Sequence, residues 1–268
     1  MKNLLTIAGS DSSGGAGIQA DLKTFAAHGC YGMSVITAVT AQNTQGVFRV
    51  QDIEPEVITA QIDAVFSDIR VDAVKLGMLS QPAAIHAVAA GLRKYQPQVI
   101  VLDPVMVSKS GYNLLAEQAC QDLINELLPL ATLITPNIPE AEKLLGRSIA
   151  TKEDMMQAAQ ELVHRQEVQN VLLKGGHLAG EADDYLYLGE GTGRWYESAR
   201  IATKNTHGTG CTLSSALAAN LAQGLTLPQA VEASKAYVTL AIEHSLSIGS
   251  GCGPTHHFVT MYKKAGIE

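Results

Sequence analysis

The segment 205–212, N-T-H-G-T-G-C-T, combines residues that can bind an anion with a reactive side chain beside it. Gly208 and Gly210 lie where a polar loop changes into helix-forming residues, and Cys211 follows directly. Leucines recur every fourth residue over 213–221, which predicts one face of a helix. The N-terminus of a helix binds anions, and a thiol placed there is expected to lose its proton more readily than a free one. We therefore predict phosphoryl transfer at this segment, with Cys211 beside the attacking oxygen.

Three roles for the Cys211 thiol are compatible with the sequence alone: a buried helix side chain, a covalent nucleophile or a proton acceptor. The glycines before it argue against simple burial. The order of residues along the chain indicates no Cys–His–Asn set.

A second glycine-rich segment, G-S-D-S-S-G-G-A-G at 9–17, lies between a short apolar run and a helical pattern. Glycines allow a backbone to approach a ligand closely. Neither G-x-G-x-x-G nor G-x-x-x-x-G-K-[ST] occurs here, so a dinucleotide fingerprint or a P-loop is weakly supported. A tight structural turn is the alternative to a ligand-binding loop.

Gln42 follows an apolar, β-branched run and offers a hydrogen-bond donor beside an acceptor. This pair suits a heteroaromatic ring that carries an amino group next to a ring nitrogen, as glutamine pairs with adenine. The alternative is a polar side chain at a strand end whose partners are backbone groups.

Asn137 and Glu140 are three residues apart where a short helix is expected to begin, so they share one face. An amide oxygen and a carboxylate can hold hydrated Mg²⁺ together with substrate phosphates. Asp103, near the end of another apolar run, adds a second carboxylate. A capping box formed by Asn137 and Glu140 is the structural alternative, and taken alone it is the stronger one.

Lys174 ends a buried strand and precedes two glycines, so its cation beside free backbone amides suits a phosphate tail. A solvated lysine before a turn is equally compatible with this pattern. His207, His256 and His257 form no H-E-x-x-H motif, and we interpret them as polar loop residues within reach of a nucleotide.

Apolar runs alternate with amphipathic segments along the whole chain, which predicts an α/β fold with a mostly parallel sheet and helices on both faces. One domain over residues 1–268 is expected, because no linker or repeat interrupts the pattern. Ser80 is expected to cap one helix, and T-K-E-D at 151–154 and Thr226 with Gln229 are expected to form capping boxes. Ligands bind at the carboxyl ends of such strands. The candidate groups at those ends are Ser10, Asp11, Gln42, Asp103, Asn137 and Lys174.

Composition limits the partners of the chain. It has 268 residues, 46% of them hydrophobic, and a net charge of −7 with scattered basic residues, so nucleic acid is not an expected partner. The four cysteines show no C-x-x-C spacing, and no apolar run approaches the roughly 20 residues of a membrane span. We expect a soluble, reduced, cytoplasmic protein without a membrane partner.

Four segments together resemble the hydroxymethylpyrimidine/phosphomethylpyrimidine kinases, the thiamine-pathway branch of the ribokinase-like superfamily. They are 8–24, 39–44, 135–140 and 205–212, they occur in the family order, and the resemblance extends over essentially the full length. It implies a ribokinase-like fold and two successive phosphorylations by ATP with Mg²⁺. The substrate, 4-amino-5-hydroxymethyl-2-methylpyrimidine, would become first its monophosphate and then its diphosphate. The resemblance also implies a homodimer.

The resemblance assigns roles to residues that match its motifs. Gln42 would hold the aminopyrimidine edge and Asp21 would reach toward the substrate. The remaining assignments are Gly9, Ala16 and Met78 for the substrate pocket; Gly208, Thr209, Gly210 and Cys211 for the anion hole and catalysis; Lys174, Thr206 and His207 for ATP; and Asp103, Asn137 and Glu140 for Mg²⁺.

Cys211 stands where the wider superfamily usually has an aspartate base. A thiol can assist the first acceptor, an alcohol, without placing a fixed negative charge beside the second acceptor, a phosphate. The loop 106–114 is expected to be a lid. Ser108, Lys109 and Ser110 stand there in place of the reactive cysteine that some pyridoxal kinases carry.

Two alternatives remain. A pyridoxal kinase or a bifunctional enzyme is the first. A non-catalytic pyrimidine-binding regulator is the second, and it is disfavoured because a pure binder does not need Asn137, Glu140, Lys174 and the anion loop together.

Overall fold

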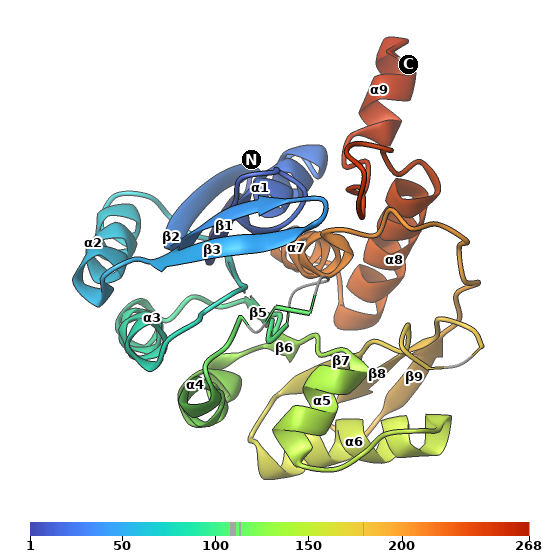
Figure 1. Cartoon of the computed structure of the whole chain (residues 1–268). Helices are drawn as coiled ribbons and strands as arrows, with labels where there is room; N and C mark the ends of the chain where they lie inside the picture. The colour runs from blue at the N-terminus through green and yellow to red at the C-terminus, as the bar shows by residue number, and fades with distance from the viewer. Residues whose placement is uncertain (108–110, 113, 179, 268) are drawn as a thin grey trace.

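A single nine-stranded sheet, in the order β3-β2-β1-β4-β5-β6-β7-β8-β9, forms the centre of the computed structural model, which describes residues 1–107, 111–112, 114–178 and 180–267 (Figure 1). All pairings from β2 through β1, β4, β5 and β6 to β7 are parallel, and the outer pairings β2–β3, β7–β8 and β8–β9 are antiparallel. The predicted mostly parallel α/β sheet is therefore confirmed. The strands are β1 (Asn3–Asp11), β2 (Tyr31–Asn43), β3 (Gly46–Asp52), β4 (Ala73–Leu76), β5 (Ile100–Leu102), β6 (Leu133–Ile134), β7 (Asn170–Leu173), β8 (Asp184–Leu188) and β9 (Gly193–Tyr196).

Helices cover both faces of this sheet, as predicted (Figure 1). One face packs against α1 (Gly17–Ala27), α7 (Thr209–Ala222) and α8 (Leu227–Glu243). The other packs against α2 (Pro55–Phe66), α3 (Pro82–Tyr95), α4 (Glu117–Asp122), the π-helix η1 (Leu123–Leu127), the 3-10 helix η2 (Leu128–Leu130), α5 (Ile138–Leu145) and α6 (Lys152–Arg165). The short α9 (Val259–Ala265) follows α8 and extends away from the sheet (Figure 1). Over the described ranges, no helix combines the length and hydropathy that crossing a membrane requires.

Local signals for helix starts are mostly confirmed. Thr151 with Asp154 and Thr226 with Gln229 form the expected capping boxes. Ser80 is not a cap: Gln81 occupies that position, and the Ser80 hydroxyl bonds to Asp52 instead. The prediction was wrong because the hydroxyl has a partner on a strand that is distant in sequence.

The return from β1 into α1 requires a glycine at residue 17. Gly17 has a φ of +55°, and a Cβ there would lie 2.3 Å from the carbonyl oxygen of Gly9. The backbone thus folds back tightly on itself, which places the start of α1 beside the carboxyl end of β1. The carboxyl ends of the parallel strands lie along the same edge of the sheet.

A buried ion pair joins the two layers that meet at this edge. Lys75 on β4 and Asp21 on α1 are both fully buried, and Lys75 Nζ lies 2.9 Å from each carboxylate oxygen. Thr6 on β1 donates to one oxygen at 2.6 Å, and Ser215 on α7 donates to the other at 2.7 Å. One carboxylate therefore connects β1, β4, α1 and α7.

We predict that Lys75→Met destabilises the fold by about 3–5 kcal/mol, because Asp21 keeps a buried charge without a counter-ion. Removing both charges in Lys75→Met/Asp21→Asn restores most of that loss. Urea unfolding of both variants measures the difference. Equal destabilisation of the single and double variants would contradict the pairing.

Candidate active site

A cavity of about 790 Å³ opens at the carboxyl ends of the strands and continues along α7 and α8. Its wall includes every site residue that the resemblance assigned except Asp21, whereas His256 and His257, which were expected within reach of a nucleotide, do not line it. Residues predicted from segments far apart in the chain are thus brought to one place. Gln42, the carboxylates of Asp103 and Glu140, and the loop that leads into α7 at Gly208 all border this one cavity.

The start of α7 has the geometry expected of an anion site. Gly208 is the N-cap with a φ of +78°, and a Cβ there would lie 1.8 Å from the carbonyl oxygen of Gly15, so only glycine fits. The Thr209 N–H bonds to Thr206, whereas no described residue accepts a hydrogen bond from the N–H of Gly210 or Cys211. These two N–H groups and the helix dipole are available to a phosphoryl group.

The Cys211 thiol differs from the sequence prediction. Burial is the main cause that raises its pKa to about 11; the nearby carboxylates of Asp21 and Asp103 act in the same direction, and the opposing Lys75 cation does not compensate. The expectation that the helix start would favour the thiolate was therefore wrong. The reason is burial: the loss of hydration around the sulfur disfavours the thiolate more than the helix start and the Lys75 cation favour it.

Asp21 lies behind the cavity wall rather than at it. Its carboxylate is fully buried and paired with Lys75, and Lys75 itself lines the cavity. The expected reach of Asp21 toward a substrate does not occur in this geometry. The sequence signal that could have identified Lys75 is a lysine in the middle of an otherwise apolar strand, at 73–76.

Asp103, Asn137 and Glu140 lie together near the start of α5. Asn137 and Glu140 form the capping box that the sequence offered as the structural alternative, with bonds of 2.8 and 2.9 Å. Burial raises the pKa of Glu140 to about 7, with Lys174 opposing and Asp103 adding to the increase. The site therefore holds two neighbouring carboxylates that a cation would stabilise.

Lys174 is part of a charge network rather than a solvated lysine. Its Nζ lies 2.9 Å from Asp103 Oδ1, which also accepts a bond from Thr135 at 3.2 Å. Asp184 accepts from the Gly175 N–H at 3.0 Å and pairs with Lys235 on α8. The prediction of a free amide at Gly175 was therefore wrong, because Asp184 accepts its hydrogen bond.

Asp184 and Lys235 both line the cavity and were missed by sequence reasoning. Lys235 lies on α8 among small and apolar residues, which is the signal that could have identified it. Its partner lies 51 residues earlier in the chain.

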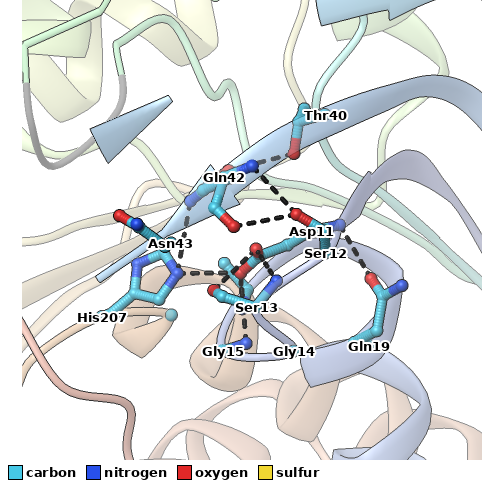
Figure 2. Close-up of polar contacts among 12 residues, drawn as sticks. Asp11, Ser12, Ser13, Gly14, Gly15, Gln19, Thr40, Gln42, Asn43 and His207 are labelled. Carbon is cyan, nitrogen blue, oxygen red and sulfur yellow. Dashed lines mark hydrogen bonds and ion pairs between the residues drawn. The ribbon is translucent and has the colours of Figure 1, made fainter. Parts of the chain in front are cut away.

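The first glycine-rich segment binds a carboxylate from within itself (Figure 2). Asp11 accepts hydrogen bonds from the N–H groups of Ser13, Gly15 and Ala16, at 2.8, 3.1 and 2.8 Å. His207 Nε2 lies 2.8 Å from the same carboxylate and 3.3 Å from the amide of Gln42. This segment is thus a self-filled turn that forms the cavity wall at Gly9 and Ala16, and His207 lies beside Gln42.

The expected lid at 106–114 is described in part. Met106, Val107 and Leu114 line the cavity, and Ser108, Lys109 and Ser110 lie outside the described residues. Over the described part of the chain, no three His, Cys, Asp or Glu side chains gather in a metal-binding group.

Comparisons with known proteins identify the family. The family model described as phosphomethylpyrimidine kinase matches residues 11–256. The hydroxymethylpyrimidine/phosphomethylpyrimidine kinase of Rhizobium meliloti strain 1021 is 54% identical over 262 residues, which cover 97% of this chain and 98% of the relative. The enzyme of the same name from Escherichia coli K12 is 50% identical over 260 residues, with 96% and 97% covered.

Solved structures agree with this assignment. A Bacillus subtilis pyridoxal kinase in complex with ADP has a TM-score of 0.89 at 41% identity, covering 97% of this chain and 99% of that one. A phosphomethylpyrimidine kinase from Clostridium difficile 630 has a TM-score of 0.81 at 52% identity, covering 90% and 100%. The resemblance inferred from the four segments is confirmed, and the chain belongs to the phosphomethylpyrimidine kinase family.

Proposed function

We propose that this chain transfers a phosphoryl group from ATP to the hydroxymethyl group of 4-amino-5-hydroxymethyl-2-methylpyrimidine, and then phosphorylates the monophosphate, in thiamine biosynthesis. The observation that carries the proposal is the pair of N–H groups of Gly210 and Cys211 at the start of α7, which bond to no residue that the structure describes and which border the same cavity as Gln42. The family membership and the names of the relatives support it.

The residues act mainly by positioning and by neutralising charge, as phosphoryl transfer requires. The acceptor oxygen would lie beside Cys211, and the N–H groups of Gly210 and Cys211 would stabilise charge on the transferred phosphoryl group. Lys174, whose Nζ would lie 3.5 Å from a Cβ at Gly210, would contact the phosphates beside these N–H groups. The ring would contact Gln42, and the nucleotide would extend toward α8.

Mg²⁺ fits the acidic face of this cavity. Asp103 and Glu140 supply two carboxylates, and Mg²⁺ commonly uses only one or two of them together with water and phosphates. Asn137 Oδ1 accepts the Glu140 N–H and retains a second lone pair. When bound, the ion would neutralise phosphate charge. Glu140 would bind it best when ionised.

A pyridoxal kinase is the second candidate, favoured by the similarity to the Bacillus subtilis structure. The Gln42 amide favours the pyrimidine, because pyridoxal has no amino group beside its ring nitrogen. The expected lid segment carries Ser108, Lys109 and Ser110 rather than a cysteine.

The proposal also includes a cytoplasmic homodimer, for which the exposed Val39 and Phe48 on the outer strands β2 and β3 offer an apolar surface.

The choice between these substrates is tested by competition. With Mg²⁺-ATP, we expect ADP release on addition of the pyrimidine alcohol and a higher kcat/KM for it than for pyridoxal. A higher value for pyridoxal would favour the second candidate, and no ADP release with either ring would favour a non-catalytic binder.

Exchanging the thiol separates the two transfers. We expect Cys211→Ala to slow the first phosphorylation, by up to about 10²-fold, more than the second, because only the alcohol must lose a proton. Cys211→Asp is expected to retain the first transfer and to impair the second, since a fixed negative charge repels a phosphate acceptor. Separate steady-state rates with the alcohol and the monophosphate measure this. Parallel losses in both steps would contradict the role of a neutral thiol.

The raised pKa of Glu140 makes stability depend on pH in the metal-free protein. Its pKa is raised from 4.5 to about 7, so between these values the folded state retains a proton that the unfolded state has released. The free energy of unfolding should therefore fall as pH rises from about 5 to about 8. Glu140→Gln, which cannot ionise, should lack this component. Identical pH profiles for the two proteins, measured by urea unfolding, would show that Glu140 titrates normally.

A further inference from the structure

We infer that hydrogen bonds with His207, which donates, and with Thr40, which accepts, fix the Gln42 amide in one orientation, and that this orientation decides which ring the site accepts. Asp11 acts through His207, so it is a positioning residue of the acceptor site. The inference rests on the proposed function and adds the physical origin of its ring selectivity. Figure 2 shows the side chains involved.

The protonation of His207 follows from the state of Asp11. Burial raises the pKa of Asp11, but hydrogen bonds from His207 and Ser13 outweigh this and lower it to about 2. An ionised carboxylate only accepts hydrogen bonds. His207 Nε2, which lies 2.8 Å from Asp11 Oδ2, must therefore carry the proton and donate it.

This assignment restricts the neighbouring amide. Gln42 Nε2 lies 3.3 Å from His207 Nε2, so two N–H donors would face each other. The oxygen and nitrogen of an amide are nearly the same size, and their places are decided by the hydrogen-bond network. Turning the Gln42 amide over brings its oxygen to His207, where it can share the donated proton.

A second contact leads independently to the same result. Thr40 Oγ1 lies 2.9 Å from the carbonyl oxygen of Ser10 and 3.2 Å from Gln42 Oε1. A hydroxyl has one proton, and the carbonyl can only accept it. The amide atom beside Thr40 must therefore be a donor, which is the nitrogen. Both ends of the amide thus require the turned orientation.

The turned amide sets the direction of the bound ring. Its oxygen, on the His207 side, accepts from an exocyclic amino group, and its nitrogen, on the Thr40 side, donates to the adjacent ring nitrogen. The hydroxymethyl group next to that amino group then lies on the His207 side, where Gly208 and the start of α7 follow in the chain.

A ring that carries an oxo group in place of the amino group has the reverse donor and acceptor pattern. It can pair with the fixed amide only when it is turned over, which directs its hydroxymethyl group to the Thr40 side. We therefore expect the oxo ring to bind and inhibit, but to be phosphorylated poorly. Selectivity should appear mainly in kcat rather than in KM.

The test compares the amino and oxo rings as substrates of the full-length protein and of matched Thr40 variants. We expect the wild-type kcat/KM ratio to favour the amino ring by about 100-fold or more. Thr40→Val, which removes the hydroxyl, should reduce the ratio by about tenfold, whereas Thr40→Ser, which keeps it, should retain the ratio. His207→Met should reduce the ratio in the same way.

A second measurement does not depend on activity. Nitrogen NMR of histidine-labelled protein at neutral pH should show His207 protonated at Nε2, and an unprotonated Nε2 would overturn the inference. If Thr40→Val lowered kcat/KM by the same factor for both rings, the inference would also be overturned, because a residue with a merely structural role has that effect. If the wild type phosphorylated neither ring, the proposed function would fail and the inference with it.

Discussion

The ion pair between Lys75 and Asp21 is the constraint on which the site depends. Two opposite charges removed from water are stable only when each finds close partners, and Asp21 has them on three elements besides its own. Ser215, one turn after Cys211 on α7, is one of them. The start of α7 is therefore held against β1 and β4 by contacts that cannot shift without exposing a buried charge.

The same charges determine the state of the thiol. Lys75 lies beside Cys211, but its cation is already matched by Asp21, and Asp103 is matched by Lys174. The surroundings of the sulfur are thus close to neutral in total, so burial controls its pKa. A neutral group at this position suits an acceptor that is an alcohol in one reaction and a phosphate in the other.

Most of the fold and much of the site could be predicted, because both depend on local patterns. The alternation of apolar runs and amphipathic segments is sufficient to predict a mostly parallel sheet with a helical layer on each face. Strand-end positions are sufficient to gather Gln42, Asp103 and Lys174 at one edge. Which charges pair could not be predicted: the resemblance assigned Asp21 to the substrate, and nothing in the local pattern indicated its partner, Lys75, which lies 54 residues away on another element.

The two glycine-rich segments were predicted as separate features, yet they form one structure. Gly208 lies against the Gly15 carbonyl so closely that no side chain fits, and Asp11 binds both the first segment and His207 of the second. A shift of one segment would therefore displace the other. Because Gln42 contacts His207 and the anion site begins at Gly208, recognition of the ring and placement of the phosphoryl group share one rigid support.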